Sequence, residues 1–186
     1  MKLTDTLRRR DFLRLGSFAA ALPFVRANKV VDEQSKRIKE GRRVVTGVNP
    51  QGKSVILSDG FVPDAARWSN PKKGSASNLW NERRLPVDLN DTNDPLIGYL
   101  MKREPPPGGV NAGIMTWEPG HSYPLHRTAT LDFVFVISGK LELILEEGST
   151  IVGPGDTIIQ RGTNHGWRVV GNEPCTIAIV LLSAVS

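Results

Sequence analysis

The sequence predicts an all-β fold, a β-sandwich or a closed β-barrel, in the C-terminal part of the chain. After Val110, short β-branched and aromatic runs alternate with glycine-containing turns, at the spacing of about 8–12 residues that is typical of such folds. This part contains no segment with the 3.6-residue period of an amphipathic helix. The whole chain also has 18 glycines and 13 prolines, which indicate frequent turns.

Each predicted strand is a short apolar run that ends at a turn. The runs are Gly113–Trp117, Leu131–Ile137, Leu141–Leu145, Thr150–Val152, Thr157–Gln160, Trp167–Val170 and Cys175–Leu182. Upstream, Arg42–Thr46 and Ser54–Leu57 flank a turn-rich connector, and this pattern predicts a β-hairpin. Prolines interrupt residues 58–109, so we expect an irregular segment that covers the core. It should pack through its large apolar side chains, Trp68, Trp80 and Leu100.

Length and charge limit the number of domains and the class of partner. A chain of 186 residues accommodates one domain with appendages. Residues 1–27 carry +4 of the formal net charge of +5, so the rest of the chain is almost neutral. We therefore exclude nucleic acid as a partner, because phosphate binding needs a strongly basic surface. Cys175 is the only cysteine and lies in an apolar run, which predicts a buried structural thiol.

The N-terminus is similar to a bacterial export signal. Arg9 and Arg10 precede Phe-Leu and a further arginine, which resembles the twin-arginine motif, and the apolar stretch Leu15–Val25 follows. This stretch is about half of the ~20 residues that span a bilayer, so we expect no permanent membrane span. The resemblance implies a periplasmic or otherwise extracytoplasmic protein. The alternative is an amphipathic N-terminal helix on a cytoplasmic protein.

Side-chain parity predicts a site at one end of the barrel interior. In an extended run from residue 126 to residue 137, the even positions share one face. Their side chains are His126, Thr128, Thr130, Asp132, Val134 and Val136. The polar members come first and the aliphatic members follow. This order predicts an interior with a polar mouth and an apolar floor.

Two spaced motifs give this pattern a family resemblance. Gly120-x5-His126-x-Thr128-x3-Asp132-x6-Gly139 resembles the first cupin motif, with Thr128 at the second histidine position and Asp132 at the glutamate position. Gly155-Asp156-x3-Gln160-x-Gly162-x2-His165 is similar to the second cupin motif, with Gln160 at the usual proline. The resemblance implies a single cupin-type antiparallel β-barrel, the double-stranded β-helix or jelly roll, with an N-terminal β-hairpin and long covering loops.

The resemblance also divides the chain. Residues 1–27 are expected to be the twin-arginine-like export signal and residues 28–41 a linker or weak helix. Residues 42–109 should hold the hairpin and the covering segment, and residues 110–186 the barrel core. The edge of the hairpin must be covered by something, and a second copy of the chain is the economical candidate. We therefore predict a homodimer.

By resemblance to cupins, His126, Asp132 and His165 would bind one divalent metal ion, which could be Fe, Mn, Ni or Zn. Thr128, Gln160 and Trp167 would line the same pocket. Two functions remain open for a small-molecule ligand. One is a metal-dependent enzyme of oxygenase, isomerase or decarboxylase type, and the other is a metal-free ligand-binding cupin without activity. The sequence assigns no catalytic residue and does not decide between them.

Overall fold

The computed structural model describes residues 32–33, 38 and 40–185. The predicted export signal, residues 1–27, and most of the predicted linker lie outside the described residues. From Gly41 onward the described chain belongs to one compact unit. None of the helical residues in the described part forms a helix long and apolar enough to cross a membrane.

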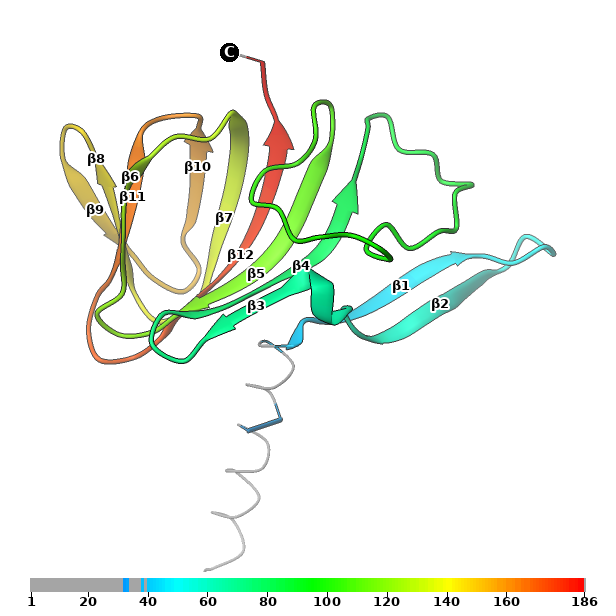
Figure 1. Ribbon diagram of the computed structural model, residues 1–186, viewed down its shortest axis with the longest axis horizontal. Coiled ribbons are helices and arrows are strands. Elements are labelled where there is room, and N and C mark those ends of the chain that lie inside the picture. The colour runs from blue at the N-terminus through cyan, green and yellow to red at the C-terminus, as the bar shows by residue number, and fades with distance from the viewer. Residues whose placement is uncertain (1–31, 34–37, 39, 186) are drawn as a thin grey trace, which may run out of the picture. The chain divides into compact units, whose positions relative to one another are not determined.

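The described chain is almost entirely β-structure, arranged in antiparallel sheets as the sequence predicts (Figure 1). The larger sheet has six strands in the order β10-β7-β12-β5-β4-β3. Its strands are β3 (Arg67–Asn70), β4 (Gly74–Glu82), β5 (Val110–Trp117), β7 (Thr130–Ser138), β10 (Thr157–Arg161) and β12 (Cys175–Ser183). The smaller sheet has four strands in the order β6-β11-β8-β9. Its strands are β6 (Ser122–His126), β8 (Leu141–Leu145), β9 (Ser149–Val152) and β11 (His165–Val169).

The predicted N-terminal hairpin is confirmed. β1 (Arg42–Val48) and β2 (Ser54–Phe61) pair antiparallel with each other and with no other described strand. A 3-10 turn, Asp64–Ala66, then leads into β3. Every run predicted after Val110 also lies within a strand, apart from Val170, which follows the end of β11.

The prediction of an irregular segment at residues 58–109 is wrong in part. This segment contains β3 and β4, and β4 pairs along its length with β5. β4 is rich in serine and asparagine, which have low β propensity, but the pairing with β5 outweighs that preference. The sheet that carries the site therefore begins at Arg67, upstream of the predicted barrel boundary at residue 110. Trp68 and Leu100 are 45% and 74% exposed, so their predicted packing role is wrong, whereas Trp80 is half-buried.

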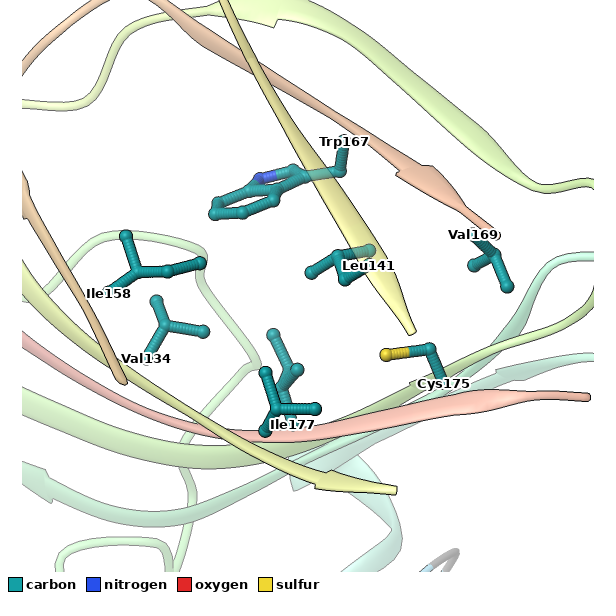
Figure 2. Close-up of a cluster of buried hydrophobic side chains, with 8 residues drawn as sticks. Val134, Leu141, Ile158, Trp167, Val169, Cys175 and Ile177 are labelled. Atoms are coloured by element: carbon teal, nitrogen blue, oxygen red, sulfur yellow. The ribbon is translucent and has the colours of Figure 1, made fainter. Parts of the chain in front are cut away.

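The core lies between the two sheets. In Figure 2, Trp167, Leu141 and Val169 of the four-stranded sheet face Ile177 and Cys175 of the six-stranded sheet. Val134 and Ile158 close the same cluster. Burial raises the pKa of the Cys175 thiol to about 11, which agrees with the predicted structural role. Trp167 is buried in this cluster and also lines the cavity described below.

The predicted alternation is confirmed in β7, but the predicted continuous run is broken. Thr130, Asp132, Val134 and Val136 are all buried, and the residues between them are more exposed. Residues 127–129, however, belong to no strand and separate β6 from β7. His126 consequently belongs to the four-stranded sheet and Asp132 to the six-stranded sheet.

Candidate functional site

A cavity of about 690 Å³ lies at the polar end of the interior and takes its lining from both sheets. Most of its wall is apolar, from Met115, Trp117, Trp167, Ile177, Ile179 and Leu181. The polar side chains include His126, Thr128, Asp132 and His165. The loop between β4 and β5 closes one side with residues 101–103. An interior of this kind suits a mostly apolar organic ligand that is held by a few polar groups.

Two imidazole rings form the centre of the polar group. His126 and His165 are register partners on β6 and β11, and their ring centroids lie 4.3 Å apart. His126 Nδ1 lies 3.0 Å from the carbonyl oxygen of Pro124, and His165 Nδ1 lies 2.9 Å from that of Thr163. A carbonyl oxygen can only accept, so Nδ1 of His126 carries the proton and its Nε2 keeps a free lone pair. His165 Nδ1 also lies 2.6 Å from Nε2 of Gln160, which is a donor, so the tautomer of His165 depends on whether Nδ1 donates to Thr163 or accepts from Gln160.

His165 is further held by the residue behind it. The side-chain amide of Gln160 lies 2.6 Å from His165 Nδ1 and is itself anchored to the backbone of Thr163. Burial lowers the pKa of His165; the hydrogen bond to Thr163 acts in the opposite direction, and the nearby His126 adds to the lowering. The imidazole is therefore neutral at neutral pH. Gln160 does not line the cavity, contrary to the sequence prediction, and positions His165 instead.

Asp132 supplies a carboxyl group from the facing sheet. It is 3% exposed, and its Oδ1 has no hydrogen-bond partner. Burial is the main cause that raises the pKa of Asp132; Glu104 adds to it, while the Thr130 hydroxyl and His126 oppose it. The neighbouring Thr128 accepts a hydrogen bond of 2.8 Å from Thr130 Oγ1. Thr128 thus stands where the first cupin motif has its second histidine, and its hydroxyl oxygen accepts a hydrogen bond from Thr130.

The predicted metal ligands reach the same cavity but do not form a cluster. Within residues 32–33, 38 and 40–185, no group of three or more His, Cys, Asp or Glu side chains is arranged to hold a metal ion. The break at residues 127–129 places the two histidines and Asp132 on opposite sheets, and Thr128 adds no strong donor. As they stand, these residues do not fit a three-ligand metal site. The divalent ion predicted at His126, Asp132 and His165 stays a prediction, and the chemistry described here uses the imidazoles and the carboxyl group alone.

The sequence interpretation missed several cavity residues. Asn111 shares the inward face of β5 with Met115 and Trp117, and the parity rule could have identified it. His121 also lines the cavity, and its ring centroid lies 6.0 Å from that of Trp117. Tyr123 packs edge-on against His126 at 4.7 Å. No local sequence signal identifies the loop residues that complete the wall.

Comparison with known proteins gives a consistent result. The family model described as "Cupin domain" matches residues 113–182. A "Cupin-domain-containing oxidoreductase srdD" of Neurospora crassa is 36% identical over 135 residues, which cover 70% of this chain and 67% of that relative. A "Cupin-domain-containing oxidoreductase fogC" of Aspergillus ruber is 34% identical over 147 residues, which cover 75% of this chain and 71% of that relative.

Among solved structures, the chain is similar to the cupin domain of Schizosaccharomyces pombe Cnp3. The TM-score is 0.48 and the identity 10%, over 76% of this chain and 87% of that domain. The relatives srdD and fogC come from fungi, and fungal relatives do not fit the bacterial periplasmic export suggested by Arg9 and Arg10. These residues lie outside the described part of the chain, so export stays a prediction.

Proposed function

The chain belongs to the cupin family, and from this premise we propose that it is a small-molecule enzyme that transfers protons on a mostly apolar carbonyl compound. One observation carries the proposal. A pair of imidazoles in contact and a buried carboxyl group stand at one end of an otherwise apolar cavity. Groups with shifted pKa values in a cavity of this kind are typical of general acid–base catalysis.

The roles follow from the protonation states. In the tautomer in which His165 Nδ1 donates to the Thr163 carbonyl, Nε2 has a free lone pair and is the base that removes a proton from the carbon next to the carbonyl. Asp132 in its protonated form, which the raised pKa favours, donates its proton to the carbonyl oxygen, so that the C–H bond breaks as an enol forms. The reverse steps return a proton to carbon. His126 lies against the His165 ring and supports its orientation.

The printed names of the two relatives include the word oxidoreductase. The second candidate is the metal-dependent enzyme. The Nε2 atom of His126 and the unpartnered Oδ1 of Asp132 are donors that a divalent ion would use, but the three predicted ligands would first have to move into one cluster. The third outcome is a ligand-binding cupin without activity.

Deuterium exchange separates these functions. We expect the protein to catalyse exchange of the benzylic protons of phenylacetone in D2O, followed by NMR, at an unchanged rate with EDTA. His165→Gln should lower this rate by about 100-fold, the usual contribution of one general base. His121→Gln, which changes another histidine of the same cavity, is the matched control and should retain the rate. A rate that EDTA removes and Fe, Mn, Ni or Zn restores would establish the metal form, and binding without exchange would establish the ligand-binding form.

We also propose that the chain is a homodimer that pairs through the β1–β2 hairpin. Val48 and Ile56 of this hairpin are 60% and 64% exposed, and Phe61 at its end is also exposed. Exposed apolar side chains on an unpaired two-stranded sheet favour association with another chain. Light scattering on a chromatography column should give the mass of a dimer at micromolar concentration. Ile56→Glu should give a monomer, and a wild-type monomer would contradict the proposal.

A further inference from the structure

A row of five buried side chains, four of them polar, crosses the six-stranded sheet at the cavity. Register pairing joins five residues on five adjacent strands into this row, in the order Gln160, Asp132, Leu181, Asn111 and Asn81. Every member is buried. Residues that are directly opposite in antiparallel strands point to the same face. Asp132, Leu181 and Asn111 line the cavity, so the middle of the row faces the proposed substrate.

Two atoms of this row have no hydrogen-bond partner. In the described part of the chain, Asn111 Nδ2 and Asp132 Oδ1 are the buried side-chain nitrogen and oxygen atoms that lack one. Asn111 is 2% exposed, and its Oδ1 accepts a hydrogen bond from Asn81 Nδ2. This bond leaves the Nδ2 group of Asn111 as the free donor. A buried polar group without a partner costs about 1–3 kcal/mol, so two in one cavity indicate a ligand that satisfies both.

We propose that Asn111 is a substrate-binding residue whose side-chain amide donates a hydrogen bond to an oxygen of the ligand. The inference rests on the proposed function, since it takes this cavity as the substrate site. The other end of the ligand lies against Asp132, and its apolar middle lies over Leu181. The two polar residues are separated by two strand spacings, about 10 Å between backbones. The substrate class is therefore an apolar ring or short chain with a polar group at each end, one of them a hydrogen-bond acceptor that faces Asn111.

A second asparagine of the cavity makes a useful contrast. Asn78 also lines it, but its Nδ2 already lies 3.2 Å from Tyr99 Oη and 3.4 Å from the carbonyl oxygen of Lys102. The amide of Asn78 therefore needs no ligand. Asn111 and Asn78 have the same chemistry and lie in the same cavity, and they differ in whether the protein itself satisfies the amide.

Two matched probes test the assignment. 4-Hydroxyacetophenone has a phenolic hydroxyl at one end and a carbonyl acceptor at the other, and 4-ethylphenol has nearly the same shape without the carbonyl oxygen. Calorimetric titration of the wild-type chain should show about tenfold tighter binding of 4-hydroxyacetophenone. Asn111→Asp keeps an acceptor for Asn81 but loses the free donor, so it should remove this preference. Asn78→Asp, the control, should keep it.

A measurement on the wild-type chain covers the case in which a variant does not fold. The side-chain amide resonances of Asn111 should shift on addition of 4-hydroxyacetophenone and stay in place with 4-ethylphenol. Equal affinity for the two probes, or unshifted Asn111 resonances, would mean that water satisfies this amide. Either result would overturn the substrate-binding role of Asn111 and leave the proposed function standing. Failure of both probes to bind at millimolar concentration would contradict the proposed ligand class and with it the proposed function.

Discussion

The two ends of the space between the sheets are built from the same strands and differ in chemistry. The apolar floor is the core cluster around Leu141 and Trp167. Along β10, Ile158 belongs to this floor and Gln160 to the polar end. Along β7, Val134 belongs to the floor and Asp132 to the polar end. The floor buries apolar surface with no polar group to satisfy, which stabilises the fold. The polar end buries one carboxyl oxygen and one amide nitrogen that lack partners, which destabilises the fold. We infer that the floor maintains the fold and that the polar end is retained for binding and chemistry.

The largest effect on stability should come from the floor. Leu141 is fully buried between the sheets, so Leu141→Ala should lower the free energy of unfolding by about 3 kcal/mol, through lost burial and a residual cavity. Urea unfolding, followed by tryptophan fluorescence, measures this change. Ile137→Ala is the matched control: it truncates a side chain that is 45% exposed and should cost less than about 1 kcal/mol. Similar losses in both variants would show that the floor is not the main source of stability.

Much of the fold was predictable because strand signals are local. Leu141–Leu145 was predicted with the observed bounds of β8, and the alternation along β7 identified the buried face that holds Asp132. Where the signal is not local, prediction failed. β6 contains Pro124, which argues against a strand, and the serine-rich β4 is a strand because β5 pairs with it.

The site was predictable in composition but not in arrangement. Motif spacing identified His126, Asp132 and His165, and all three line one cavity. The sequence treated residues 126–137 as one run, however, and so placed two of these side chains on one strand. The break at residues 127–129 separates them onto two sheets. Parity alone places Asn111 on the inward face of β5, but its role depends on its register with Leu181 and Asn81, pairings between segments far apart in the sequence.

The smallest expected effect is the pH-dependent loss of stability that comes from burying Asp132 at the polar end. Burial raises the pKa of Asp132 above its value in the unfolded chain, so the folded protein holds this proton more tightly. As the pH rises above the unfolded value of about 4, the unfolded chain releases the proton first, and the folded state loses stability until its own pKa is passed. Asp132→Asn has no proton to lose. The melting temperature of this variant minus that of the wild type should therefore increase between about pH 4 and pH 7, since groups that do not interact with residue 132 contribute equally to both proteins.

His126 opposes the shift as a cation, so the increase should be larger in His126→Gln than in the wild-type background. A difference that is constant with pH, or that falls as the pH rises, would mean that Asp132 is stabilised as a carboxylate in the folded protein, and it would then be the wrong group to donate a proton to the substrate.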